Sequence, residues 1–130
     1  MSLRLFSEFG TLEMVLTHRP SREIERLTPY NQSELLFEDV PYLEVMQKEH
    51  DFFTELMRST TNTRVLKVHD LLIDILLNDT LKLELFRKEL QPKGMEEAAE
   101  DILAHYSTSE IASILISGIK FKELKKKYRS

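Results

Sequence analysis

Between residues 43 and 57, hydrophobic residues and one histidine recur at three- and four-residue steps, which predicts a long helix with one buried side. The recurring residues are Leu43, Met46, His50, Phe53 and Met57. Pro41 suits the first turn of a helix, because it lacks an amide hydrogen and its φ is already close to the helical value. Asp39, just upstream, is a candidate N-cap. We therefore expect a helix that begins at Pro41 and can cover a sheet.

Two short apolar segments flank this helix and are bounded by residues that favour turns. The first comprises Leu12, Met14, Val15 and Leu16, and the second comprises Val65, Leu66 and Val68 after Asn62. Such segments are typical of short, mostly buried strands. Thr28 and Pro29 favour a further short helix through residues 35–37. Strand, helix and strand in this order predict a β-α-β unit with parallel strands.

From His69 onward the pattern predicts helices separated by capping and breaking residues. The expected breaks are Asn78–Thr80, Pro92 with Gly94, Ser107–Ser109, and Gly118, and a short basic helix is expected over 121–128. The predicted fold class is α+β and predominantly α, with one β-α-β unit followed by a bundle of about four to five helices. We expect a first domain over residues 1–68 and a helical domain over residues 69–130.

Composition and charge narrow the range of functions. The chain has 130 residues, of which 42% are hydrophobic and 31% are charged, as in soluble globular proteins. No apolar run approaches the ~18 residues that a membrane span needs, and the first ten residues do not resemble a secretory signal. We expect a cytoplasmic protein that does not bind membranes. The net charge of -4 also argues against nucleic acid as a partner.

Several stretches carry a resemblance to a known family. Ser7–Glu8, Gly10, His18–Pro20 and Leu27–Pro29, together with the run from Glu34 to Phe53, resemble the amino-terminal segment of arginine deiminase, a guanidine-hydrolysing enzyme of the pentein group. The resemblance continues at 65–72 and 115–119. It implies that residues 1–68 are an incomplete part of a pentein α/β propeller and that residues 69–130 are the helical insertion of that family. The family's enzymes are much longer than this chain.

The resemblance also implies a reaction, the hydrolysis of L-arginine to L-citrulline and ammonia without a metal or organic cofactor. In that family a cysteine thiolate attacks the guanidinium carbon, a histidine and acidic residues move protons, and two aspartates hold the guanidinium. This chain has no cysteine, and none of those catalytic residues can be placed in it. Covalent catalysis needs a nucleophile, so we expect the chain alone to be inactive. Leu36 matches the family position whose backbone lines the amino-acid end of the arginine pocket. The alternative is that Leu36 is only a packed core residue.

Two other functions stay open as hypotheses. The helical part could serve as a non-catalytic protein-interaction module, and the basic residues of 120–129 after Thr108–Ala112 faintly resemble a DNA-binding helix-turn-helix.

The four histidines, His18, His50, His69 and His105, lack the spacing of a helical zinc site, so we expect no metal site. His50 is expected to be packed and hydrogen-bonded, and Arg19 to be exposed in a turn. A two-stranded sheet leaves open edges, and we therefore expect self-association through the first strand or the helices around it.

Overall fold

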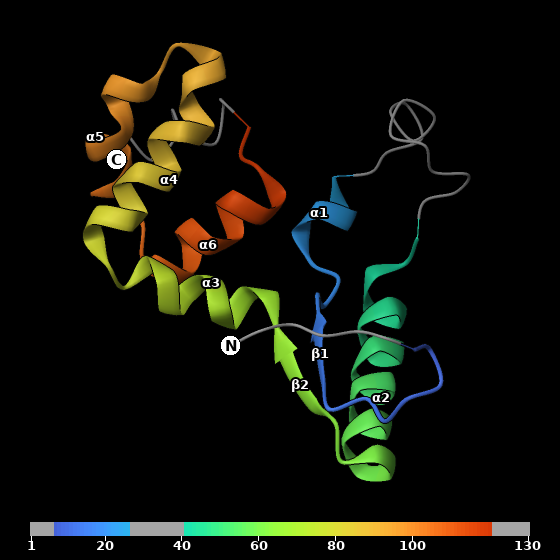
Figure 1. Ribbon diagram of the computed structural model, residues 1–130. Coiled ribbons are helices and arrows are strands. Elements are labelled where there is room, and N and C mark those ends of the chain that lie inside the picture. The colour runs from blue at the N-terminus through green and yellow to red at the C-terminus, as the bar shows by residue number, and fades with distance from the viewer. Residues whose placement is uncertain (1–6, 27–40, 121–130) are drawn as a thin grey trace.

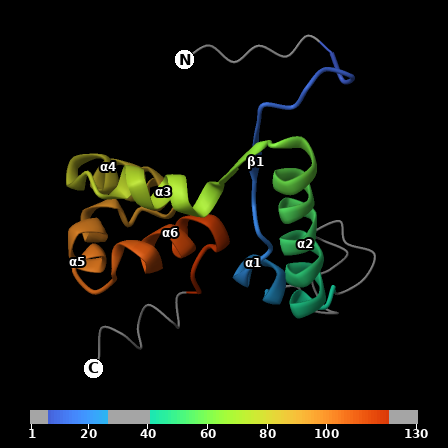
Figure 2. The ribbon, with the colours of Figure 1, turned by 90° about the horizontal axis from the view of Figure 1, so that it is seen from below.

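The computed structural model describes residues 7–26 and 41–120, which form two units side by side (Figures 1 and 2). The sheet unit contains β1 (Met14–Thr17), α1 (Arg22–Glu25), α2 (Leu43–Thr61) and β2 (Arg64–Lys67). The helical unit contains α3 (Val68–Leu76), α4 (Asp79–Leu90), α5 (Ala99–Leu103) and α6 (Thr108–Ser117). Strand β2 continues directly into α3, and α1 contacts α6, so two connections hold the units together.

The two strands pair in parallel, as the sequence predicts. Val15 lies beside Val65 and Leu16 beside Leu66 in the ladder. The pairing extends to the preceding loop, where the Thr63 hydroxyl donates to the Leu12 carbonyl at 2.7 Å. Parallel strands require a crossover connection, and α2 supplies it between β1 and β2. The predicted α+β fold, predominantly helical with one β-α-β unit, is confirmed.

The strands differ from the prediction in burial and in length. Leu16 is 58% exposed, so β1 is not mostly buried. The reason is that successive side chains of a strand point to opposite faces, and the face that carries Leu16 is not covered at this position. Val68 is the first residue of α3 rather than the last residue of β2, because the chain passes from strand to helix without a loop.

Helix α2 begins later than expected. Pro41 lies before the helix, Tyr42 is the N-cap with extended backbone angles, and Leu43 is the first helical residue. The Tyr42 carbonyl accepts the first backbone bonds, from the amides of Val45 and Met46. No side chain caps this end through a hydrogen bond. The start is therefore determined by backbone geometry around Tyr42, and the proposed Asp39 cap lies outside the described residues.

The buried side of α2 is also shifted by one position from the prediction. Leu43, Met46, His50 and Met57 are partly buried as expected, but Phe53 is 54% exposed and Thr54 is only 3% exposed. The steps 43, 46, 50, 54 and 57 follow one line along the helix, whereas Phe53 lies at the edge of that line, about 60° from its centre. Thr54 tolerates burial because its hydroxyl donates to the Asp51 carbonyl at 3.0 Å.

The helical unit follows the predicted breaks closely. The Asn78 side chain accepts from the Leu81 amide at the start of α4, and Ser107 and Glu110 form a reciprocal capping box at the start of α6. Two short 3₁₀ segments, η1 (Gln91–Lys93) and η2 (Glu96–Ala98), separate α4 from α5. Gly94 lies between them at φ +62°, a left-handed conformation that favours glycine.

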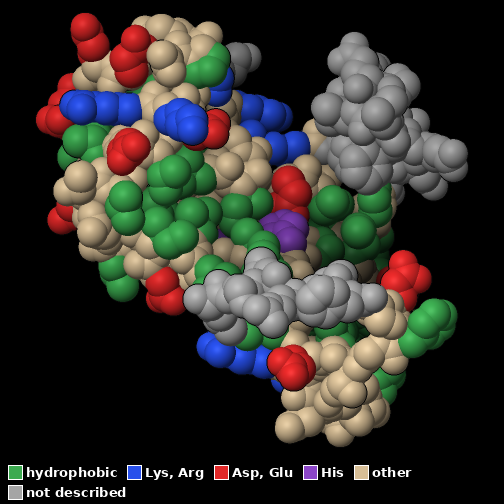
Figure 3. Space-filling model, viewed as in Figure 1, with side chains coloured by type: hydrophobic (Ala, Val, Ile, Leu, Met, Phe, Trp, Pro, Cys, Tyr) green, Lys and Arg blue, Asp and Glu red, His purple; other side chains and the backbone are tan. Residues whose placement is uncertain are grey.

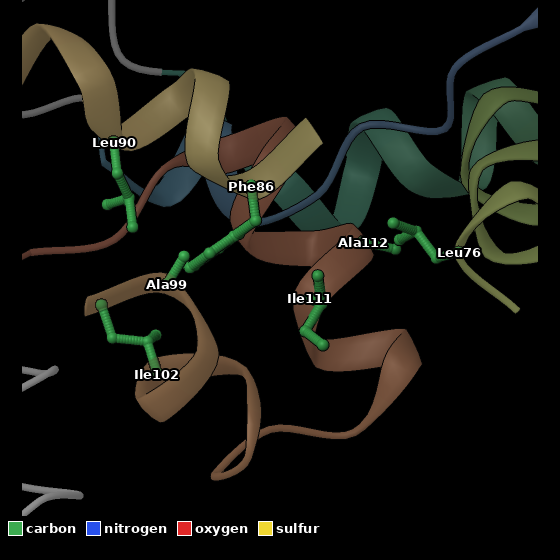
Figure 4. Close-up of a cluster of buried hydrophobic side chains, with 7 residues drawn as sticks. All are labelled: Leu76, Phe86, Leu90, Ala99, Ile102, Ile111 and Ala112. Atoms are coloured by element: carbon green, nitrogen blue, oxygen red, sulfur yellow. The ribbon is translucent and has the colours of Figure 1, made fainter. Parts of the chain in front are cut away.

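All the buried hydrophobic side chains of the described chain lie in the helical unit (Figure 4). They are Leu76, Phe86, Leu90, Ala99, Ile102, Ile111 and Ala112. Phe86 points toward Ala99, and Leu76 lies against Ala112, so α3, α4, α5 and α6 all contribute to one cluster. In the described part of the sheet unit, the only residues in the buried class are Thr54 and Thr63.

Two predicted helices fall outside the described residues, and one observed helix was not predicted. The helix through residues 35–37 and the basic helix over 121–128 lie outside the described residues. The four-residue helix α1 has no hydrophobic periodicity that could have indicated it. It follows Ser21 and begins where the chain turns from β1 toward α6.

Leu76 offers a direct test of the core. We expect Leu76→Ala to lower the free energy of unfolding by about 2–5 kcal/mol, because it removes buried contacts and leaves a cavity. Leu77→Ala is the matched control, since Leu77 is 70% exposed and its truncation is expected to change stability by less than about 0.5 kcal/mol. Urea unfolding followed by circular dichroism measures both. Equal effects of the two substitutions would contradict this description of the core.

Candidate functional site

A polar cavity of about 230 Å³ lies between the two units, at the carboxyl ends of both strands. Parallel strands bring their carboxyl ends to the same edge of a sheet, where many α/β proteins bind ligands. The segment after β1 and the β2–α3 junction form most of the lining, and α6 closes one side: His18–Ser21 and Glu23; Lys67, His69 and Asp70; Ser113 and Ile116. Figure 3 shows histidine surface between the two units on this side of the molecule.

Glu23 accepts two short hydrogen bonds at the edge of the cavity. The His18 Nε2 donates to Glu23 Oε1 at 2.7 Å, and the Ser21 amide donates to the same oxygen at 2.7 Å. Burial of Glu23 disfavours its charged form, but these hydrogen bonds outweigh burial, and the pKa of Glu23 lies below its usual value. Glu23 therefore lines the cavity as a carboxylate, and its other oxygen, Oε2, is buried without a hydrogen-bond partner among the described residues.

Arg19 connects the segment after β1 to α2. Its Nε donates to Asp51 Oδ1 at 2.8 Å and its Nη2 donates to Asp51 Oδ2 at 2.9 Å, which is a bidentate pair. The neighbouring Pro20 carbonyl accepts from Gln47 Nε2 at 2.9 Å. The Arg19 side chain is 39% exposed, as expected of a residue after the strand, but its pairing with Asp51 was not predicted. Arg19 and Gln47 fix the course of the chain where it leaves the sheet and borders the cavity.

The remaining polar groups do not form a nucleophile and base. The Ser113 hydroxyl lies 3.5 Å from His69 Nε2, which exceeds the ~2.6–3.2 Å separation expected of such a pair, and it donates instead to the Ser109 carbonyl at 3.0 Å. The Lys67 ammonium forms no ion pair with the described residues. The described residues of the cavity therefore do not supply a nucleophile and base for covalent catalysis.

The other two histidines lie away from the cavity. His50 is packed on the buried side of α2 as expected, but its Nδ1 makes no hydrogen bond in the described structure and lies 3.9 Å from Asp51 Oδ1. Nδ1 therefore does not supply the hydrogen bond that was expected of His50. His105 Nδ1 contacts the Asp101 carbonyl at 2.7 Å. Within residues 7–26 and 41–120 no three metal-ligating side chains gather at one point.

The sequence singled out His18–Pro20 and His69, which line the cavity, but it did not predict the pairs that His18 and Arg19 form. Leu36, the predicted substrate contact, lies outside the described residues, as does most of the basic tail considered for DNA binding. Arg19 and Asp51 are 32 residues apart, and no local pattern predicts their pairing. Only the identity of the side chains, an arginine after a strand and an aspartate on the crossover helix, could have suggested it. No helix in the described ranges has the length and hydropathy needed to cross a membrane.

The ion pair of Arg19 predicts a specific pH dependence. Hydrogen bonds from Arg19 lower the pKa of Asp51, so this carboxyl stabilises the fold above its unfolded pKa, near 4, and the contribution is lost as pH falls through its lower folded pKa. We expect Asp51→Asn to reduce the fall in unfolding free energy between about pH 6 and pH 3. Asp74→Asn is the control, because Asp74 is exposed and pairs with no described residue. Identical pH dependence of Asp51→Asn and the unsubstituted chain, in urea titrations, would contradict the role of this pair.

Comparison of the sequence with known proteins identifies its family. The sequence profile of the family described as "Arginine deiminase" matches residues 33–129. An arginine deiminase from Limosilactobacillus reuteri is 34% identical over 98% of this chain and 32% of the relative. One from Listeria monocytogenes is 38% identical over 95% of this chain, and one from Borrelia recurrentis is 34% identical over 95%. The chain spans about a third of the length of these relatives. It belongs to the arginine deiminase family.

Proposed function

We propose that this chain provides the first part of an arginine deiminase, which converts L-arginine and water to L-citrulline and ammonia, and that it is inactive alone. The family match over residues 33–129 is the observation that carries this proposal. The sequence contains no cysteine, and the thiolate that attacks arginine in this family must therefore come from outside these residues. The described cavity offers no alternative nucleophile beside a base, which supports an incomplete site.

The proposal also divides the chain into two structural segments. Residues 1–68 form an incomplete pentein-type segment, and residues 69–130 form the helical insertion. The buried cluster is confined to α3–α6, and β2 passes directly into α3 at Val68, which supports a boundary within one residue of the proposed one. We also propose a cytoplasmic location, on the resemblance to the family.

Exposed apolar surface in the sheet unit supports a further part of the proposal, self-association. Leu16 on β1 and several large side chains on α2 are exposed, and surfaces of this kind mark interaction sites. The same observation favours one alternative function, a non-catalytic interaction module that uses these surfaces for partner binding. The two functions differ in whether the chain restores deiminase activity to a complementary fragment.

Citrulline formation from L-arginine distinguishes these possibilities. The purified chain is assayed alone, then mixed with a fragment of the Listeria monocytogenes enzyme that begins after the region matched here. We expect citrulline only in the mixture, because only the fragment contains the cysteine. A fragment with that cysteine replaced by serine is the control and should abolish the activity. Turnover by the chain alone would overturn the proposed incompleteness, and an inactive mixture would favour the interaction module.

Leu36 is proposed to contact the amino-acid end of the substrate through its backbone. In the active mixture, we expect Leu36→Ala to leave the KM for L-arginine within about threefold, because the main chain is retained. Leu36→Pro removes the amide hydrogen and restricts φ, and we expect it to raise KM by about tenfold or more. A larger effect of Leu36→Ala than of Leu36→Pro would indicate that the leucine side chain acts through packing.

A further inference from the structure

Helix α2 has a second apolar side that the described chain does not cover. Val45, Phe52, Phe53 and Leu56 are all exposed, and Phe52 is 71% exposed. We call these four residues the outer face of α2. Glu49 interrupts it between Val45 and Phe52, so its continuous apolar part is Phe52, Phe53 and Leu56. Phe52 and Leu56 lie far around the helix from the buried line through Met46, His50 and Thr54 described above, and Phe53 lies between the two.

A helix that is apolar on two sides is normally covered on both. Figures 1 and 2 show the helical unit on the side of the sheet away from α2, so it does not reach this helix. The outer face therefore needs an occupant from outside the described residues. The charges beside the face identify which occupant fits it.

We propose that the occupant is α2 of a second copy of this chain, packed antiparallel across a two-fold axis near Phe52. Lys48 and Glu55 are seven residues apart, or two helical turns, and lie on the same flank of Phe52. In an antiparallel pair centred on Phe52, Lys48 of each copy lies opposite Glu55 of the other. A two-fold interface requires such a self-complementary arrangement, and this flank provides it twice.

The existing contacts of these charges do not prevent the pairing. Lys48 Nζ lies 2.7 Å from Glu44 Oε1, and Arg58 Nη1 lies 3.7 Å from Glu55 Oε2. Both are exposed pairs within one helix, which contribute little to stability and can be exchanged. With 19 residues, α2 is about 28 Å long, and the facing phenylalanines lie near its middle. This inference rests on the self-association proposed above and names its surface.

The first experiment measures oligomeric state by sedimentation velocity between about 1 and 500 μM. We expect a monomer–dimer equilibrium for the unsubstituted chain and a monomer for Phe52→Glu, with unchanged circular dichroism. Leu77→Glu is the matched control, since it places the same charge on an exposed apolar position of the helical unit. A monomeric unsubstituted chain would overturn self-association altogether. A dimer that survives Phe52→Glu would overturn this surface while leaving self-association in place.

A charge exchange then tests the antiparallel geometry. Lys48→Glu and Glu55→Lys are each expected to weaken the dimer by about tenfold, because each places like charges opposite one another twice. The double substitution restores opposite charges and should return the dissociation constant to within about threefold of the original. No restoration would overturn the antiparallel pairing and would point to a different occupant, such as the rest of a deiminase. Deiminase activity of the mixture described above is scored separately, so failure of the two proposals can be distinguished.

Discussion

The rest of the structure depends on one constraint: the buried hydrophobic side chains of the described chain are confined to the helical unit. Hydrophobic burial is the main favourable term in folding, and in the described chain its fully buried side chains lie only in α3–α6. The sheet unit is held by other contacts: the parallel ladder, the hydroxyl of Thr63 on the Leu12 carbonyl, and the Arg19–Asp51 pair. Single hydrogen bonds and exposed ion pairs contribute modestly to stability, and this unit retains exposed apolar side chains such as Leu16 and Phe52.

This exposed apolar surface is relevant to the family, whose members are longer than this chain. The chain spans about a third of its relatives, and a β-α-β unit with an exposed Leu16 and an exposed side of α2 is suited to contact further protein. The polar cavity lies at the junction, where the strand ends meet α6. Its lining residues come from both units, so the relative position of the units determines its shape. The Arg19–Asp51 and Gln47–Pro20 contacts fix the sheet side of that cavity.

Individual elements show where sequence reasoning succeeds. Asn78, Ser107, Gly94 and Gly118 were assigned as caps or breaks, and the helices of the helical unit begin or end around them. Capping depends on the few residues around a helix end, so the sequence is informative there. At α2 the prediction of a long helix is confirmed, but it begins two residues after Pro41, and Thr54 replaces Phe53 on the buried side. A difference of one position rotates a side chain by about 100°, and periodicity alone did not resolve it.

The sequence by itself determined the family, the fold class, the parallel β-α-β order and the absence of a cysteine, because these depend on residue identity and local pattern. Only the tertiary structure decided that Arg19 pairs with Asp51, that His18 meets Glu23 at a cavity, and that one side of α2 is covered while the other is exposed. Those features depend on which distant elements pack together. A hydrophobic residue has the same identity whether or not a neighbour reaches it, so its burial follows from the packed arrangement.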